Sequence, residues 1–385
     1  MVEKADVLVI GAGIAGTTLA LELADAGLSV VVLERRYVGG GSSSLNAGGV
    51  RQQFALDINV RVAVETRRRI DEFAQRYGEP ISSRQVGYLF TYAGDEDGGL
   101  LRNAMEVQRR WDVPTRPVTP DEIAELVPGI ELDGVRGGVF CPTDGYVDPR
   151  ATVTAFGRAA RRAGARIIDA EVTGVETANG RVEAVTAEDR RFSADVYVNA
   201  AGAWAPTIAR MYGGDLPITP MRSEIVVLDH ALVGGRLTPM VLDYPLGLAF
   251  HSEGRGLLIS AGTTAVRPDA PREVSPEPDR FAEVQGRIVR RLPEVTGYGM
   301  AHAWAGLIEV TPDNNPIVDR THLDNLFTVA GFSGHGMCLA PGVARHAAAL
   351  IRGETPGLPI EAYRLSRFDQ GTALPVETLW SGARA

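Results

Sequence analysis

The sequence contains almost no lysine: Lys4 is the only one among 39 basic side chains, and all the others are arginines. Cysteine is equally scarce, because Cys141 and Cys338 are the only two, and they form no recognisable disulfide or metal-binding framework. No apolar run approaches the roughly 18 residues that a membrane span needs, and the N-terminus carries no evident secretory signal. We therefore expect a protein of the reducing cytoplasm, with no metal site and no membrane partner.

The balance of charge excludes a further class of partner. With 39 basic and 48 acidic side chains the net charge is −9, whereas nucleic acids and anionic membranes are bound through basic surfaces. The 385 residues, 45% of them hydrophobic, suffice for two domains or one large composite with a sizeable core. The composition therefore indicates a globular protein and argues against nucleic acid or an anionic membrane as its partner.

The chain opens with a nucleotide-binding pattern, ADVLVIGAGIAGTTLALELADAGLSVVVLERR. An apolar strand over residues 5–10 leads into the G-x-G-x-x-G glycines Gly11, Gly13 and Gly16, then a helix and a second strand that ends at Glu34. The glycines permit a tight turn, close backbone approach to a pyrophosphate and close helix–strand packing, and the helix N-terminus offers N–H groups to phosphates. Glu34 suits ribose hydroxyls and disfavours a 2′-phosphate. The pattern predicts dinucleotide binding without distinguishing FAD from NAD.

A long run of small residues, GGGSSSLNAGGVRQQF, follows the second strand over residues 39–54. Small residues let backbone amides lie against a large flat ligand, and serine hydroxyls can bond phosphate or ribitol oxygens. An NAD-binding domain would instead continue into another helix and strand. The run therefore favours FAD, and a flexible surface loop is the alternative.

Together with later stretches, these motifs resemble the FAD-dependent amine oxidoreductases that include D-amino-acid oxidase, glycine oxidase and the sarcosine oxidases. The later stretches are DGYVDPRATVTAFGRAARRAGARI (144–167), ADVYVNAAGAWA (194–205), AWAGLIEVTPDNNPIVD (303–319) and NLFTVAGFSGHGMCLAPGV (325–343). The resemblance is greatest to the branch of the sarcosine oxidase β-subunit and the imino-acid dehydrogenases. It implies an α/β fold (an α+β composite) in which a Rossmann-like FAD-binding domain is interleaved with a mixed-sheet substrate domain.

The resemblance also implies discontinuous domains. The FAD-binding domain is expected to comprise residues 1–80, 142–220 and 302–370, the substrate domain residues 81–141 and 221–301, and a loosely held C-terminal tail residues 371–385.

Local signals predict elements within these domains. Asp148 followed by Pro149 indicates a helix start, Asn179-Gly180 a hairpin turn, and Thr119 the first residue of a capping box. Further expected elements are strands over residues 84–92 and 223–228, a solvated loop over 267–278, an amphipathic helix over 279–292 and an apolar helix from Pro341 to about Ile351.

The resemblance implies that FAD is held noncovalently by segments far apart in the sequence. Covalent members of the family use a cysteine where this chain has Gly306, and a histidyl link elsewhere stays open. A helix N-terminus after GFSGHG would stabilise the negative charge of the reduced flavin. The expected FAD contacts are Gly11, Gly13, Ile14, Ala15, Gly16, Glu34, Arg35, Gly41, Ser42, Ser43, Ser44, Ala47, Gly48, Gly49, Val50, Val172, Ala201, Gly202, Trp204, Gly306, Gly331, Gly334, His335, Gly336 and Met337.

The implied reaction is oxidation of a C–N bond: a hydride leaves the carbon beside the amine nitrogen for flavin N5, and the imine product hydrolyses. Arg51 stands where the family holds a carboxylate-binding arginine, which offers a planar bidentate fork; a structural salt bridge or a phosphate contact is the alternative. His251 and Tyr244, in LDYPLGLAFHSEGRGLLISAG, are candidates for the substrate pocket, and a structural role stays open for each.

Two departures from the family pattern concern lysine. Cys338 occupies the position of a carboxylate-binding lysine of the monomeric sarcosine oxidases, and we expect it to be a small buried hydrophobe. The lysine that assists their reaction with oxygen also has no counterpart, because Lys4 precedes the first strand. Both departures weaken assignment to sarcosine itself and favour a dehydrogenase over an oxidase.

The expected substrate is a secondary or N-methyl amino acid, an imino acid or a related amine, with oxygen or another electron acceptor as the second partner. The alternatives are a D-amino-acid oxidase acting on primary amines and a non-catalytic flavin-binding subunit or assembly factor. The sequence allows action alone or within a homo- or hetero-oligomer, and it does not name the amine.

Overall fold

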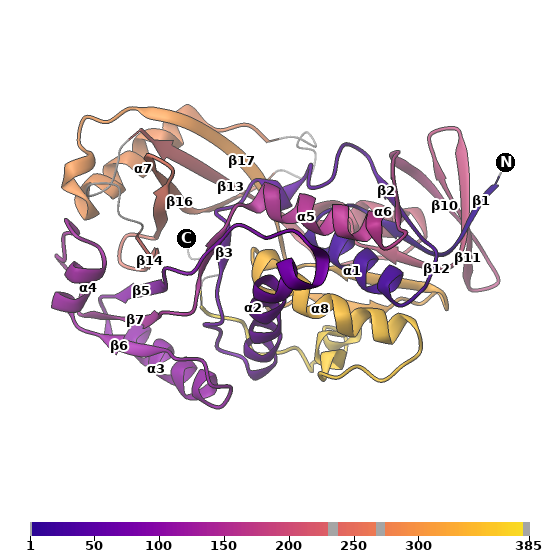
Figure 1. The fold of residues 1–385 in the computed structure, drawn as a ribbon, viewed down its shortest axis with the longest axis horizontal. Coiled ribbons are helices and arrows are strands. Elements are labelled where there is room, and N and C mark those ends of the chain that lie inside the picture. The colour runs from indigo at the N-terminus through magenta and orange to yellow at the C-terminus, as the bar shows by residue number, and fades with distance from the viewer. Residues whose placement is uncertain (1, 230–237, 267–273, 380–385) are drawn as a thin grey trace.

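A computed structural model describes residues 2–229, 238–266 and 274–379. Two eight-stranded sheets form the two halves of the molecule, and a small three-stranded sheet accompanies them (Figure 1). Indigo, magenta and yellow segments meet in the half that holds β1, so early, middle and late parts of the chain build it together (Figure 1). This arrangement confirms the expected α/β fold class.

The first sheet has a parallel centre. Its strands are, in spatial order, β9 (Arg166–Asp169), β2 (Val30–Glu34), β1 (Val2–Ile10), β12 (Arg190–Asn199) and β19 (Leu326–Ala330), completed by β18 (Ile317–Arg320) and the hairpin of β10 (Val172–Ala178) and β11 (Arg181–Ala187). The carboxyl ends of parallel strands lie at one edge of a sheet, where ligands bind in open α/β folds. Register pairs Ile10 with both Leu33 and Asn199, so the segments that follow these residues meet at that edge.

Helices cover both faces of this sheet. On one face lie α1 (Ile14–Asp25), α2 (Asp57–Tyr77), α5 (Pro149–Arg162) and α8 (Gly336–Ile351), and on the other α6 (Ala205–Met211). Figure 1 shows α1, α2 and α8 packed beside one another. As predicted, Asp148 caps α5, because its side chain accepts the Ala151 N–H at 2.8 Å. The predicted turn between β10 and β11 is confirmed, since Asn179 and Gly180 both have positive φ, of 50° and 74°.

The second sheet is antiparallel except where β14 pairs with β5. Its strands, in spatial order, are β17 (Met300–Val310), β13 (Thr219–Leu228), β16 (Gly256–Ala265), β15 (Leu248–Glu253), β14 (Met240–Asp243), β5 (Tyr88–Tyr92), β7 (Gly137–Cys141) and β6 (Arg116–Val118). The helices α3 (Asp95–Arg109), α4 (Pro120–Leu126) and α7 (Pro278–Arg291) belong to the same half. The small sheet joins β3 (Gly49–Val50), β8 (Gly145–Val147) and β4 (Ser83–Arg84).

Several local predictions for this half are confirmed. Thr119 forms the capping box of α4 with Glu122, and α7 matches the expected amphipathic helix. The strand expected over 84–92 is split into β4 and β5. Of the loop predicted over 267–278, residues 267–273 lie outside the described residues.

One expected domain boundary falls inside a strand. The last FAD-binding segment is expected to begin at residue 302, which lies within β17. This strand pairs with β13 along its length, with one irregularity of register between Met300 and His302. The strand instead carries the chain from the second sheet to the ligand-binding edge of the first.

The last long helix begins earlier than predicted. Helix α8 starts at Gly336, and Pro341 lies inside it. A proline within a helix removes one backbone donor, but the neighbouring Gly342 N–H finds an acceptor in Thr66 Oγ1 of α2, at 2.9 Å. The GFSGHG segment therefore leads directly into a helix N-terminus.

The C-terminal segment is not loosely held as far as the structure describes it. Glu377 and Leu379 are 0% and 1% exposed, and the Glu377 N–H donates to the Asp313 carbonyl at 3.0 Å. Residues 380–385 of the predicted tail lie outside the described residues. Among the described helices, none is both long and apolar enough to cross a membrane.

Candidate active site

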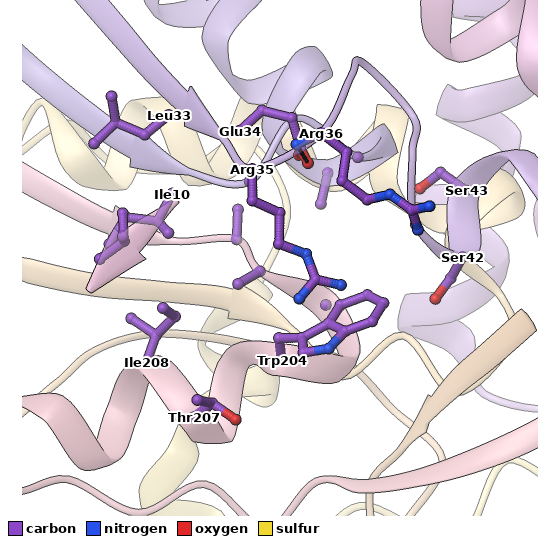
Figure 2. A pocket seen from close by; sticks show the side chains of 18 of the residues that line it. Ile10, Leu33, Glu34, Arg35, Arg36, Ser42, Ser43, Trp204, Thr207 and Ile208 are labelled. Atoms are coloured by element: carbon purple, nitrogen blue, oxygen red, sulfur yellow. Dashed lines mark hydrogen bonds between the residues drawn. The ribbon is translucent and has the colours of Figure 1, made fainter. Parts of the chain in front are cut away.

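A first cavity lies at the carboxyl edge of the parallel sheet, in front of the N-terminus of α1. The glycine-rich turn, the end of β2, the 3-10 turn at Ser42–Ser44 and the segment from Ala200 to Trp204 line it. Figure 2 shows the side chains of Glu34, Ser42, Ser43 and Trp204 around this space. Backbone N–H groups at a helix N-terminus and a nearby carboxylate are the groups that the nucleotide pattern predicts.

Polar contacts fix the rim of the first cavity. Glu34 accepts the Ala12 N–H at 2.8 Å and the Arg36 N–H at 3.1 Å, so its carboxylate is held at the end of β2. The Arg35 guanidinium lies over the Trp204 ring, 4.2 Å from its centroid, as Figure 2 shows. This cation–π contact joins the loop after β2 to the loop after β12.

Small residues keep the first cavity open because side chains there would fill it or collide with its walls. A Cβ on Gly11 would lie 2.7 Å from the Ala200 carbonyl oxygen, and one on Gly16 would lie 1.9 Å from the Gly11 oxygen. Gly202 has φ of +53°, and a Cβ there would meet Glu309 Oε2 at 2.8 Å. The glycines of the turn thus have the packing roles that the sequence predicts.

A second cavity continues from the first, since Ile14, Ser42, Ser43, Glu309 and Phe332 line both. It runs between the two sheets, bounded by the small-residue loop, by strands of the second sheet and by the GFSGHG segment. The N-terminus of α8 opens onto it, because His335, Gly336 and Met337 belong to the lining. The positive end of a helix dipole therefore faces this space.

Arg51 is a buried cation in the lining of the second cavity, with a side chain that is 2% exposed. Its guanidinium lies 4.1 Å from the centroid of the Phe54 ring and donates to the backbone carbonyls of Gln53 and Leu379. Within the part of the chain that the structure describes, no carboxylate forms an ion pair with it. Carbonyls orient the guanidinium, and the buried Asp144 interacts with it without an ion pair: burial raises the pKa of Asp144, and the charge of Arg51 acts against this. A guanidinium held in this way is suited to an anionic group of a ligand.

His251 lies outside the lining of both cavities. It is 1% exposed, and its ring nitrogens face the backbone carbonyls of Ser252 at 2.8 Å and Ala47 at 3.0 Å. Burial lowers the pKa of His251 to about 4, so the ring is neutral at physiological pH. The predicted pocket role is replaced by a structural one: the ring joins β15 to the small-residue loop and stacks on Tyr146, with centroids 4.0 Å apart.

Tyr244 is also absent from the lining of both cavities. Its ring packs edge-on against Phe90, with centroids 5.7 Å apart, in the cluster that includes Tyr88. Tyr88 lines the second cavity instead. Its hydroxyl lies close to Gly49, because a Cβ added to Gly49 would be 3.0 Å from the Tyr88 hydroxyl oxygen. The structure thus brings Tyr88 to the place expected of Tyr244.

Most of the expected FAD contacts line one or both cavities. Those in the first are Gly11, Gly13, Ile14, Ala15, Glu34, Arg35, Gly41, Ser42, Ser43, Val172, Ala201, Gly202 and Trp204. Those in the second are Ile14, Ser42, Ser43, Ala47, Gly49, Gly306, Gly334, His335, Gly336 and Met337. Gly16, Ser44, Gly48, Val50 and Gly331 lie in the same segments but line neither cavity.

Glu309 lies where the two cavities join and was not predicted from the sequence. Its Oε1 accepts the Phe332 N–H at 3.1 Å. Although part of the side chain faces the cavities, Oε2 is buried and has no hydrogen-bond partner among the described residues. Burial raises the pKa of Glu309 to about 7, against the effect of its backbone hydrogen bonds. An acid inside the apolar strand AWAGLIEV was the available signal.

Replacing Glu309 by glutamine is expected to change how the stability of the FAD-free protein depends on pH. A carboxyl whose pKa rises from 4.5 to about 7 on folding favours the folded state at low pH and loses that contribution between these values. E309Q should therefore gain about 2–3 kcal/mol relative to wild type between pH 4.5 and pH 8. Urea unfolding at several pH values measures this difference.

E65Q is the matched control for that measurement. His346 donates to Glu65 at 2.7 Å and holds the pKa of the Glu65 carboxyl below its ordinary value, although burial acts to raise it. The free energy of unfolding of wild type should therefore exceed that of E65Q most at high pH. An E309Q profile parallel to wild type would show that Glu309 titrates normally in the folded protein.

Other missed residues in the lining of the second cavity come from separate strands of the second sheet. They are Ser223, Ile225, Met240, Leu242, Ala249 and Ser260. No sequence motif marks these residues, because residues that are neighbours in this cavity are far apart in the sequence. Apart from Arg51 and Glu309, the side chains of this cavity are uncharged unless His335 is protonated.

The donor set and the small-residue walls fit FAD. The Ser42 hydroxyl and Glu309 Oε2, in the lining of both cavities, are buried polar atoms that lack partners among the described residues. A hydroxyl and a carboxyl at the junction of two cavities suit the polar groups of a dinucleotide. Gly306, where the covalent members of the family use cysteine, supplies no nucleophile, and a Cβ there would meet Leu45 Cβ at 2.9 Å.

Comparisons with known proteins agree with this site. The family model described as FAD dependent oxidoreductase matches residues 6–350. Among solved structures, L-proline dehydrogenase from P. horikoshii is 33% identical, with a TM-score of 0.89 over 96% of this chain and 99% of that one. Among curated proteins, FAD-dependent oxidoreductase domain-containing protein 1 of Bos taurus is 29% identical over 95% of this chain and 85% of its own length. Mitochondrial sarcosine dehydrogenase of Homo sapiens is 28% identical over 95% of this chain but only 42% of its own length.

The family match extends from the first strand of the Rossmann-like sheet to the last turn of α8, and it therefore includes the segments that line both cavities. The chain thus belongs to the FAD-dependent oxidoreductase family.

Proposed function

We propose that the protein oxidises the C–N bond of a secondary amino acid, such as an N-methyl or cyclic imino acid, and that it acts as a dehydrogenase. The observation that carries this proposal is Arg51, a buried guanidinium in the second cavity that forms no ion pair with a carboxylate of the described residues. Such a group binds the carboxylate that every amino acid has. Likeness to an L-proline dehydrogenase and a sarcosine dehydrogenase supports the choice of a secondary amine.

FAD, when bound, supplies the hydride acceptor for this reaction. The chain supplies position: Arg51 would orient the carboxylate, and apolar side chains such as Leu242 and Ile225 would exclude water from the reacting carbon. The charge of Arg51 and the low polarity of the lining disfavour a second cation, so the amine should bind uncharged. The pH dependence of the reaction should therefore follow deprotonation of the substrate amine.

The absence of lysine from the cavity supports the dehydrogenase assignment. Lys4 is the only lysine of the chain, and it is exposed near the start of β1, whereas the cavities lie at the opposite end of that strand. The family resemblance assigns the reaction with oxygen to a lysine, and this cavity has no lysine. We expect slow reoxidation by oxygen and fast reoxidation by an artificial acceptor.

Anaerobic titration of the flavoprotein with amines tests the proposal. L-Proline, sarcosine and other N-methyl amino acids should bleach the visible flavin absorbance, and primary D-amino acids should not. Bleaching only by primary D-amino acids would favour the alternative D-amino-acid oxidase. Bound FAD that no amine reduces would favour the alternative of a non-catalytic flavin-binding subunit.

Arg51→Gln is expected to lower kcat/KM for the best carboxylate substrate at least about 100-fold, because a charge-assisted bidentate contact is lost from a buried site. Bound flavin should stay near the wild-type level, since the guanidinium donates to carbonyls of the protein chain. Steady-state kinetics and the ratio of flavin to protein absorbance measure both quantities. Unchanged kcat/KM would remove Arg51 from substrate binding.

A further inference from the structure

The end of the described chain lies beside Arg51, although the two are remote in sequence. The Arg51 guanidinium donates to the carbonyl oxygen of Leu379, two residues after the buried Glu377. This segment follows the last helical turn and lies outside the family match, which ends at residue 350, and none of the motifs in the sequence assigns it a role. Its contacts suggest a specific one.

Glu377 has a carboxylate that is 0% exposed and fully occupied by N–H donors. Its oxygens accept from the Ala55 N–H at 3.0 and 3.1 Å, the Leu56 N–H at 3.3 Å and the Asn59 side-chain amide at 2.9 Å. These donors lie in the short segment that joins Arg51 to α2 and in the first turn of that helix. The carboxylate therefore holds the chain that carries Arg51.

Leu379 is held from two sides. Its N–H donates to Glu377 Oε1 at 3.2 Å, and its side chain is buried in the cluster that contains Tyr88, Met240 and Leu242, which line the second cavity. The position of its carbonyl is thus set by the carboxylate on one side and by the cavity wall on the other.

These contacts form a closed circuit. Glu377 holds the segment after Arg51 and the amide of Leu379, and the Leu379 carbonyl in turn holds the Arg51 guanidinium. On the basis of the proposed function of Arg51, we propose that Glu377 is a positioning residue for the substrate-binding guanidinium and that the segment from Glu377 to Leu379 completes the carboxylate site.

The physical reason is preorganisation. A free arginine side chain has many rotamers, and a ligand that must order them binds more weakly. Glutamine at position 377 would keep the size but replace one oxygen by an NH₂ group, and donors face both oxygens of the carboxylate. Either orientation of the amide would place donor against donor, which loosens the circuit at Leu379 in one orientation and at Leu56 and Asn59 in the other.

The experiment measures binding of benzoate, a simple carboxylate, to the flavoprotein through the change in flavin absorbance. Wild type, E377Q, L379G, R51Q and the control E65Q are compared, with benzyl alcohol as the uncharged probe. Glu65 lies in α2 and pairs with His346, so E65Q alters the same helix outside the circuit. Kinetics with the best amino-acid substrate and a thermal melt accompany each variant.

We expect the Kd for benzoate to rise at least tenfold in E377Q and about threefold in L379G, with KM rising in parallel. At saturating substrate kcat should stay within about threefold of wild type, and benzyl alcohol should bind all variants equally. A merely structural role would lower the melting temperature of E377Q and leave the Kd unchanged, and that result overturns the inference. L379G leaves the Glu377 contacts with α2 in place, so an unchanged benzoate Kd in it overturns the inference even when E377Q does not fold.

The two proposals fail separately. If R51Q binds benzoate as wild type does, the proposed function of Arg51 is wrong and the positioning role falls with it. If R51Q loses benzoate binding while E377Q and L379G retain it, only the positioning role is wrong.

Discussion

Gly16→Ala should yield a protein that is nearly colourless after purification, with an affinity for added FAD at least about 100-fold weaker than that of wild type. The added Cβ would lie 1.9 Å from the Gly11 carbonyl oxygen and 3.5 Å from the Val9 side chain. Backbone cannot yield as a flexible side chain does, so α1 must move away from β1. The turn that would hold the pyrophosphate lies between these two elements, and it would lose its geometry.

Gly286→Ala is the matched control, since it places the same methyl group in a helix of the other half. A Cβ at Gly286 meets no atom within 4 Å in α7, and alanine is the better helix former by up to about 1 kcal/mol. This variant should keep its flavin and melt at or above the wild-type temperature. FAD titration of deflavinated protein measures both variants, and wild-type affinity in G16A would refute the close packing of α1 on the glycine turn.

Arg367→Met should destabilise the protein by about 3–5 kcal/mol, since it leaves a buried carboxylate without its cation. Arg367 and Asp313 are 1% and 3% exposed in their side chains, and they form two parallel contacts of 2.8 and 3.0 Å. The guanidinium also donates to the Tyr363 and Asn315 carbonyls, at 2.8 and 3.0 Å, so several acceptors would lose their donor together. Urea unfolding of the FAD-free protein measures the loss.

An exposed ion pair of similar geometry provides the comparison. Arg191 contacts Glu176 through two nitrogens at 2.8 and 3.1 Å, but both side chains are nearly half exposed. R191M should therefore destabilise the protein far less than R367M, because solvent screens the exposed pair. The double variant D313N/R367M should recover part of the stability lost in R367M, and equal losses in R367M and R191M would contradict the role of burial.

The nucleotide half of the site was predictable because its signals are local. Gly11, Gly13 and Gly16 follow a strand and open a helix, so their roles depend on neighbours in the chain. The Asp148 cap and the Asn179-Gly180 turn were predictable for the same reason. The start of α8 was not, because Pro341 is a local signal for a helix start, whereas Thr66 of a distant helix lets the helix run through it.

The substrate half depended on tertiary packing. His251 and Tyr244 lie on the predicted segment, but burial against Ala47 and Phe90 keeps both out of the cavity lining, and Tyr88 lines it instead. Which side chain of a strand reaches a cavity depends on sheet register and on the partner sheet, and neither can be predicted from the sequence of that strand alone.

By itself, the sequence determined the α/β fold class, the cofactor and the chemistry of the family, since these rest on several motifs and the residues of each motif are neighbours in the chain. It also determined that lysine takes no part in the site, because Lys4 is the only lysine of the chain. Only the tertiary structure decided that Glu309 joins two cavities and that Glu377 and Leu379 meet Arg51. The reason is that these contacts join segments hundreds of residues apart, and their energies depend on burial and hydrogen-bond geometry that exist only in the folded chain.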